Sequence, residues 1–375
     1  MFKDYLFNTP CKILAGIDTR KTLGKQVKKY AGKVVLICTD KKSQRSGLLV
    51  DILESLSREN LAYVIFDELD CCPTIEIVEQ GLNQYRNEEC DILLAVGGSS
   101  AIDTAKVISS LTKSPGESTC QEAPVIAVPT NASLGSEFHN WSVITDDLSN
   151  KTIIMDRVPT PKLVIMDPYM LQVLNATMAG QTGLQILSIA IDGYVSLGSY
   201  ELTDILNLKA IELTAKNLRR FVANRRDLES ATAVQNAGLY AALGSANSGL
   251  GNVFAMTTTL ANHSKIAAGK AWSVILPRVM KYNAMACPDK FVNIAKCFGE
   301  KVSDLPINEA ALKSVDGVAK LISDIDLPSS FNSQDIPHGL IEILSQKVLE
   351  CQHCRTNPRD TKLDHLVSLF SKTVS

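Results

Sequence analysis

The feature that most limits how this chain can fold is the stretch Asp91–Lys106. It opens with Ile92–Val96, a continuous apolar run of the kind found in strands that are covered on both faces, and it closes with residues that favour a helix. Between them lies Gly97-Gly98-Ser99-Ser100, where glycines permit a tight turn and a close ligand, and where serines bring hydroxyl and N–H groups to the positive end of the helix. The pattern suits a pyrophosphate, although an ordinary strand-to-helix turn can carry the same residues without any ligand.

The residues that follow this turn extend the pattern. Gly97–Ser100 together with Asp103 and Lys106 resembles the glycine motif of the iron-containing (group III) alcohol dehydrogenase family. Within that family the chain looks most like the lactaldehyde reductase type, for instance over Leu202–Glu212. The resemblance implies a Rossmann-like three-layer α/β domain followed by a helical bundle, the fold shared with dehydroquinate synthase, and an NAD(H)-dependent or NADP(H)-dependent activity. It covers nearly the whole chain, through Phe7, Lys12–Gly16, Pro129–Glu137, Asp192–Ser196 and Asn357-Pro358-Arg359.

Composition bounds the class of protein. A chain of 375 residues with 45% apolar residues is long enough for two domains with separate cores. The formal charge of −2 and the lack of a long basic run argue against nucleic acid or an anionic membrane surface as a partner. No apolar run is long enough to span a membrane and no export signal is evident, so we expect a cytoplasmic protein. Ten cysteines in such a large chain are expected to be reduced thiols rather than a disulfide framework.

Hydrophobic periodicity divides the chain near residue 172. Residues 1–172 alternate short apolar strands with amphipathic helices, which predicts a dinucleotide-binding α/β domain. Residues 173–375 show helical periodicity with few strand signals, which predicts an all-helical domain. Thr203 is expected to cap a helix that runs to about Phe221. Further helices are expected over Ala231–Ser245, Ala255–Ala268, Ala271–Asn283 and Leu340–Cys351.

Several residues are candidates for the cofactor site. Asp40 follows the apolar strand Val34–Cys38, where an acidic side chain can accept hydrogen bonds from the adenosine ribose and disfavour the 2′-phosphate of NADP, or can simply cap the next helix. The other candidates come from the resemblance. The family's loop of threonines retains Thr130 but has Asn131 and Leu134 at its later positions, and the family's asparagine near the adenine is replaced by Cys72. The resemblance also implies cofactor contacts by Asp103, His139 and Lys151.

The family's metal site is the point at which the resemblance fails. Relatives hold a divalent metal with an Asp and a His four residues apart on one helix, a spacing that puts both on one face, and with two later His. Here these positions carry Gln185, Ile189, Phe254 and Ala268, and a further His near the reacting carbon is replaced by Thr258. Isoleucine, phenylalanine and alanine offer no lone pair to a metal, so we expect no catalytic iron or zinc.

Five histidines leave few ways to rebuild such a site. His338, His353 and His365 fall in the expected C-terminal helices, which leaves His139 and His263 as the candidates nearest the active-site region. Either of these two could equally be an exposed histidine. For the substrate oxygen, hydrogen bonds could come from Gln185, Thr258, His263 and Tyr194.

Two functional hypotheses remain open from the sequence. One is a metal-independent oxidoreductase that transfers a hydride between NAD(H) and an unusual carbonyl, alcohol or conjugated small molecule. The other is a non-redox relative that still binds nucleotide, either a pseudoenzyme or an enzyme for elimination or condensation. The resemblance also implies a homodimer that pairs through the strand near Lys12–Leu14.

Overall fold

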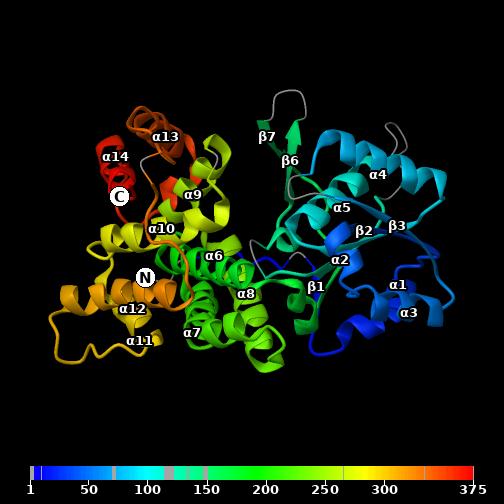
Figure 1. Cartoon of the computed structure of the whole chain (residues 1–375), viewed down its shortest axis with the longest axis horizontal. Helices are drawn as coiled ribbons and strands as arrows, with labels where there is room; N and C mark the ends of the chain where they lie inside the picture. Colours follow the sequence, from blue (N-terminus) through cyan, green and yellow to red (C-terminus); the bar gives the residue numbers. More distant parts are fainter. Residues whose placement is uncertain are drawn as a thin grey trace. The chain divides into compact units, whose positions relative to one another are not determined.

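The structure is a computed structural model that describes residues 4–9, 11–69, 73–113, 122–132, 135–146, 151–264, 266–332 and 334–374. Its contacts divide the chain into two compact units (Figure 1). The α/β unit comprises Thr9–Asn131 and Gly135–Leu174, and the helical unit is formed mainly by Asn175–Ser375. The N-terminal residues before Thr9, together with Ala132, group with the helical unit, a return of the chain that periodicity alone did not indicate.

A six-stranded parallel sheet forms the centre of the α/β unit. Its strands lie in the order β1-β8-β5-β4-β2-β3, and every hydrogen-bonded pair is parallel. Parallel strands of this kind are buried on both faces, which explains their uninterrupted apolar sequences. The strand bounds are β1 Lys12–Ala15, β2 Val34–Asp40, β3 Ala62–Leu69, β4 Ile92–Gly97, β5 Val125–Pro129 and β8 Leu163–Met166.

Helices cover both faces of this sheet (Figure 1). On one face, α1 (Leu23–Lys28) and α3 (Val50–Arg58) bury their apolar residues against alternate strand residues such as Val35 and Ile37. On the other face, α4 (Ile75–Asn87) and α5 (Ser99–Thr112) approach each other closely. A Cβ at Gly81 of α4 would lie 2.6 Å from Ile108 of α5. The predicted three-layer α/β architecture is therefore confirmed.

The order of the strands fixes where a ligand would bind. From β2 the chain moves outward to β3, and it then returns to the other side of β2 to form β4 and β5. In open parallel sheets, ligands bind beyond the carboxyl ends of the strands where this direction reverses. The reversal here lies between β2, which ends at Asp40, and β4, which ends at Gly97. A short antiparallel hairpin of β6 (Trp141–Asp146) and β7 (Lys151–Asp156) completes the unit.

The second unit is helical, as the sequence predicts. Its central helices α6 (Ala176–Val195), α9 (Asn252–His263) and α10 (Ala268–Asn283) pack against one another. The remaining helices are α7 Glu201–Ala223, α8 Leu228–Ser248, α11 Pro288–Cys297, α12 Ile307–Asp324, α13 His338–Glu350 and α14 Leu363–Ser371. None of the helices in the described ranges is long and apolar enough to cross a lipid bilayer.

Two helix boundaries differ from the sequence predictions. Tyr200, not Thr203, caps α7, and the Thr203 hydroxyl instead accepts a hydrogen bond of 2.9 Å from the Tyr200 backbone N–H as the reciprocal half of a capping box. The single helix predicted over Ala255–Ala268 is also wrong. α9 ends at His263 because Ser264 is extended and its hydroxyl donates to the Leu260 carbonyl, and α10 begins at Ala268.

Candidate functional site

The glycine turn lies at the reversal point of the sheet. A Cβ at Gly97 would be 2.7 Å from the Cβ of Ala101, and a Cβ at Gly98 would be 3.1 Å from Nδ2 of Asn131. Gly98 is the N-cap of α5 with φ −80°, and no side chain caps the helix there. The glycines are therefore required for space rather than for a left-handed turn, which corrects the tight-turn argument. They leave open space at the N-terminus of α5, whose first turn contains Ser99 and Ser100. An open helix N-terminus of this kind suits a phosphate group.

Asp40 sits beside this turn. A Cβ on Gly97 would lie 3.8 Å from Oδ2 of Asp40, so the ends of β2 and β4 are immediate neighbours. The Asp40 carboxylate also caps α2 (Lys41–Arg45), accepting from the Ser43 backbone N–H at 2.8 Å and from the Ser43 hydroxyl at 2.7 Å. Capping is thus one role of Asp40, and a ribose contact through its remaining lone pairs stays a prediction.

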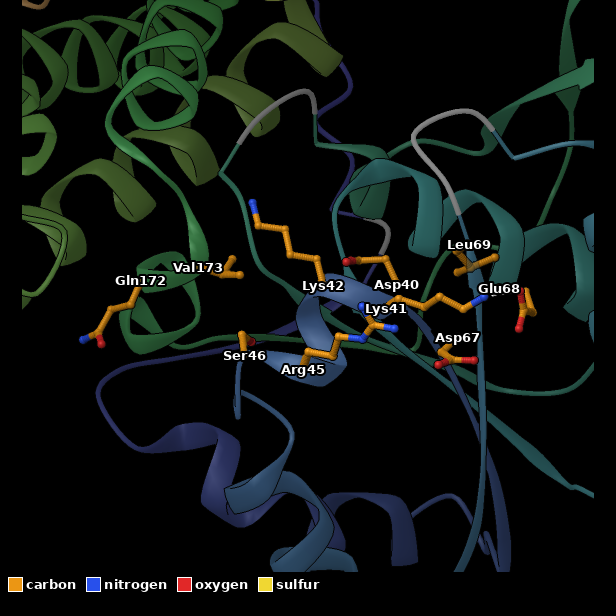
Figure 2. A pocket seen from close by; sticks show the side chains of 10 residues that line it. All are labelled: Asp40, Lys41, Lys42, Arg45, Ser46, Asp67, Glu68, Leu69, Gln172 and Val173. Atoms are coloured by element: carbon orange, nitrogen blue, oxygen red, sulfur yellow. Dashed lines mark hydrogen bonds and ion pairs between the residues drawn. The ribbon is translucent and has the colours of Figure 1, made fainter.

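An open pocket of about 790 Å³ adjoins Asp40. Figure 2 shows the basic side chains of α2 next to the acidic end of β3, with Gln172 and Val173 on another side. Lys41 forms an ion pair of 2.6 Å with Glu68 across this pocket. Its size and mixed polar lining fit one end of a nucleotide. The lining residues are Asp40, Lys41, Lys42, Arg45, Ser46, Asp67, Glu68, Leu69, Gln172 and Val173.

A buried charge cluster supports the loop that follows β5. Lys106 of α5 is fully buried, and its Nζ donates to the carbonyls of Ser136 at 2.9 Å and Trp141 at 2.6 Å. Its Nζ also lies 3.7 Å from Oδ1 of Asp103, which is itself buried. Burial lowers the pKa of Lys106 to about 8, and it raises the pKa of Asp103 to about 6 and that of Glu137 to about 7. The structure therefore gives Asp103 a supporting position, and its direct cofactor contact stays a prediction.

The structure describes some of the other cofactor candidates and not the rest. Thr130 is buried and donates its backbone N–H to the Gly97 carbonyl at 2.9 Å, which joins it to the glycine turn. Asn131 faces Gly98, as described above. The His139 ring stacks on Trp141 with centroids 4.7 Å apart at the base of the hairpin. Leu134 and Cys72 lie outside the described residues, as does the side chain of Lys151, which begins β7.

In the helical unit, three packed helices carry the positions that the resemblance assigns to metal ligands. Gln185 and the buried Ile189 lie on α6, Phe254 lies on α9, and Ala268 is the first residue of α10. A Cβ at Gly269 would be 2.2 Å from Cδ of Gln181, so the start of α10 touches α6 one turn before Gln185. The helices thus bring these positions to one region even though the side chains are not metal ligands.

Phe254 has aromatic neighbours on two sides. The Trp272 ring of α10 lies 6.2 Å from it, and the His353 ring meets it edge-on at 4.9 Å and 76°. His353 belongs to the short helix η4 (Gln352–Thr356). His353 was not among the histidines expected nearest the active-site region, which were His139 and His263, yet it contacts Phe254. One sequence feature could have pointed to His353, namely the close spacing of Cys351-Gln352-His353-Cys354 before the Asn-Pro-Arg motif.

The four residues that the sequence predicts as hydrogen-bonding partners of the substrate differ in their burial and in the hydrogen bonds they already make. Gln185 is half-buried, and its side chain makes no hydrogen bond within the described part of the chain. The Thr258 hydroxyl donates to the Phe254 carbonyl at 2.8 Å, so toward a substrate it can only accept. His263 is exposed at the last residue of α9. Tyr194 is buried against α11, where its hydroxyl accepts a hydrogen bond from Asn293 at 3.1 Å, and its contact with a substrate stays a prediction.

A polar network fixes the start of α9 in this region. Oδ2 of Asp192 accepts from the backbone N–H groups of Gly251 at 3.0 Å and Phe254 at 2.9 Å. Oδ1 of Asn357 accepts from the Asn252 N–H at 3.2 Å, and Nδ2 of Asn283 donates to it at 2.9 Å. These bonds hold Phe254 and the end of η4 in a fixed relation.

Among the residues that the structure describes, no three His, Cys, Asp or Glu side chains gather in a way that could hold a metal ion. The described cysteines are all free. Burial raises the pKa of Cys351, and it raises that of Cys354 to about 12, so both are protonated thiols at neutral pH.

Comparison with known proteins agrees with this geometry. Residues 10–168 match the model "Iron-containing alcohol dehydrogenase", and residues 179–374 match "Fe-containing alcohol dehydrogenase family, C-terminal". Lactaldehyde reductase from Escherichia coli is 31% identical over 92% of this chain and 93% of its own, and choline dehydrogenase from Bacillus subtilis is 31% identical over 96% and 92%.

Solved structures give the same fold. A crystal structure of 1,3-propanediol oxidoreductase has a TM-score of 0.93 and 27% identity, covering 99% of this chain and 100% of that one. A sulfoacetaldehyde reductase from Bifidobacterium kashiwanohense, solved in complex with NAD+, has a TM-score of 0.88 and 21% identity over 99% of each chain. With both halves matched by family models, the chain belongs to the iron-containing alcohol dehydrogenase family and is an NAD-linked oxidoreductase of that family.

Proposed function

We propose that the protein interconverts a small alcohol and its carbonyl form with NAD(H) and without a resident metal ion. The observation that carries the proposal is an asymmetry between the units. The glycine turn and Asp40 remain at the reversal point of the sheet, whereas Ile189, Phe254 and Ala268 stand at positions that ligate metal in relatives. We therefore expect the protein to bind the nicotinamide cofactor that exchanges the hydride, but not the metal ion that would act as a Lewis acid.

The residues of the α/β unit fit NAD(H). The open N-terminus of α5 and the space over Gly98 would receive the pyrophosphate, and Asp40 would accept from the adenosine ribose beside the pocket of Figure 2. Thr130 and Asn131 would border the phosphates. When bound, the cofactor supplies or accepts the hydride. His139, Lys151 and Leu134 are carried over as cofactor residues from the resemblance alone.

The donor set does not fit iron or zinc. Of the residues at the ligand positions, only Gln185 carries a lone pair, and a single amide oxygen does not make a metal site. A metal ion normally stabilises the developing alkoxide by several kcal/mol, so protein hydrogen bonds or the substrate itself must take over that role. The free amide of Gln185 can donate to a substrate oxygen, and a conjugated or protonated acceptor would need less polarisation.

A test begins with calorimetric titration of chelator-treated protein with NADH and then NADPH. We expect NADH to bind more tightly because of Asp40. Hydride transfer is then followed at 340 nm, in the presence of chelator, with the substrates named for relatives: lactaldehyde, choline, methanol and 1,3-propanediol. Failure to bind either nucleotide would remove hydride transfer from consideration. Activity that is abolished by chelator and restored by iron would refute metal independence.

The other expectations remain predictions of the same proposal. The small net charge favours a small-molecule substrate over nucleic acid or a membrane surface. A cytoplasmic homodimer is expected by resemblance, and light scattering of the purified protein would measure the dimer directly.

A further inference from the structure

His353 brings an ionisable ring against Phe254, which stands at a position that the resemblance assigns to a metal ligand. Its edge contact with Phe254, at 4.9 Å between centroids, puts an imidazole beside the side chain that replaces the third ligand. The ring of His353 is half-buried, so it is neither sealed in the core nor free in solvent.

Its position is set by the backbone on which it lies. The Thr356 hydroxyl at the end of η4 donates to the Leu250 carbonyl at 2.5 Å, just before α9 begins. The next residue, Asn357, accepts from the Asn252 N–H. Two consecutive side chains therefore tie η4 to the start of α9, the helix that carries Phe254. A catalytic group needs this kind of fixed support.

The ring nitrogens of His353 are available. Neither makes a hydrogen bond within the described residues, whereas Nδ1 of His365 is paired with the Tyr282 hydroxyl at 2.8 Å. Burial lowers the pKa of His353 from its usual value of 6.5, so the neutral imidazole dominates at pH 7. A neutral imidazole carries one N–H donor and one nitrogen acceptor, the two functions that alcohol and carbonyl oxygens require.

We propose that His353 is the catalytic acid–base residue that handles the substrate oxygen in place of the metal, an assignment that rests on the proposed function. In alcohol oxidation, the unprotonated ring nitrogen of His353 takes the hydroxyl proton while the carbon-bound hydrogen leaves as hydride to the nicotinamide. The O–H and C–H bonds break, the C=O bond forms, and the imidazolium afterwards returns its proton to water. In reduction, the imidazolium gives the proton to the carbonyl oxygen as the hydride reaches the carbon.

The pH dependence follows from this assignment. Oxidation requires the neutral ring, so kcat/KM should fall as the pH drops through the pKa of His353, below 6.5, and should be level above it. No charged partner accounts for the shift, which burial alone produces. Among the described side chains, the titratable and charged groups of η4 and its N-cap are Cys351, Cys354 and Arg355, and those of α9 and α13, which pack against η4, are His263, Glu342, Lys347 and Glu350. Asp192 of α6 lies near Cys354.

The test compares wild type with His353→Phe, which keeps a ring against Phe254, and with His353→Ala. His365→Ala is the matched control, because His365 is also half-buried but is engaged by Tyr282. Each protein is first titrated with NADH and melted. We expect unchanged NADH affinity, a fall in kcat of about 10²- to 10⁴-fold in both His353 variants, and a smaller change in KM. Added imidazole should restore part of the activity of His353→Ala but not of His353→Phe.

A second readout does not depend on turnover. The ring ¹⁵N resonances of His353 are followed in NADH-saturated protein during titration with propanamide, whose oxygen mimics that of an aldehyde. We expect the His353 resonances to shift saturably and those of His365 to stay in place.

The outcomes separate the two claims. Wild-type turnover in His353→Phe, or a His353 resonance that ignores propanamide, would overturn the role of His353. An activity loss without imidazole rescue, accompanied by a lowered melting temperature, would also overturn it and would make His353 structural. If wild type oxidises and reduces no substrate although propanamide shifts His353, the proposed hydride transfer fails while the contact of His353 with the substrate oxygen stands.

Discussion

The expected binding sites at the carboxyl edge of the parallel sheet and in the α6–α9–α10 region depend on different parts of the chain: the first on the backbone, the second on side chains. At the sheet edge, the expected ligand contacts come from backbone N–H groups and from the absence of side chains, because a Cβ at Gly97 would lie 2.7 Å from Ala101. In the helical region, the resemblance implies a metal site made from side chains alone. Ile189 and Phe254 stand at positions that the resemblance assigns to such donors, and both side chains are buried. A site made from backbone persists with the fold, whereas a site made from side chains can be lost without unfolding the helices.

The largest expected effect tests how much the buried charge of Lys106 contributes to the stability of the α/β unit. Lys106→Met would leave the Ser136 and Trp141 carbonyls without their donor and would leave Asp103 and Glu137 buried without a cation. We expect a loss of about 3–5 kcal/mol in the free energy of unfolding, measured by urea denaturation. Lys25→Met, at an exposed position of α1, should change it by less than about 0.5 kcal/mol. Equal stability of the two variants would contradict the supporting role of Lys106.

The next prediction introduces metal ligands at the four positions that the resemblance assigns to them in the helical region. The combined variant Gln185→Asp, Ile189→His, Phe254→His and Ala268→His should bind zinc, because α6, α9 and α10 still pack together. Zinc at 100 times its Kd should stabilise the variant by about 2.7 kcal/mol in thermal melts. Chelator-treated wild type should show no change with zinc or iron. A saturable rise in the wild-type melting temperature would refute the claim that the region has lost its metal.

The same division explains what sequence could predict. Strands β2 and β4 were recognisable because they are short apolar runs buried on both faces. The contact of His353 with Phe254 could not be predicted, because it depends on η4 returning to α9 through hydrogen bonds between residues that are far apart in the chain. Sequence periodicity predicts a helix or strand and its buried face, but it does not predict which distant segment a short turn such as η4 contacts.

A smaller effect is expected from filling the space over the glycine turn. Gly98→Val would place branched carbons toward Asn131, where a Cβ alone would already lie 3.1 Å from Nδ2. The branched side chain would also occupy the space expected for the pyrophosphate, so NADH affinity should fall about 10- to 100-fold, or about 1.4–2.7 kcal/mol, in fluorescence titration. Gly339→Ala is the control, since a Cβ there meets nothing within 4 Å. If NADH bound equally well to both variants, the pyrophosphate would have to lie away from this turn.

The smallest predicted effect decides between the two roles of Asp40. Asp40→Ser keeps a side chain that can cap α2 through the Ser43 N–H but removes the carboxylate from the pocket beside Lys42 and Arg45. Without the repulsion of Asp40, these cations would favour a 2′-phosphate, and the NADPH-to-NADH affinity ratio should rise about 10-fold, or about 1.4 kcal/mol.

Asp67→Asn is the matched control for that measurement, because Asp67 lines the same pocket from β3. An equal rise in the affinity ratio for Asp67→Asn would mean that the total charge of the pocket, not the position of Asp40, selects the cofactor. An unchanged ratio in Asp40→Ser would leave Asp40 as a helix cap only. The sheet edge would then lack a side-chain contact with the cofactor, as we propose that the helical region lacks metal ligands, and only the backbone features of the turn would still distinguish the two regions.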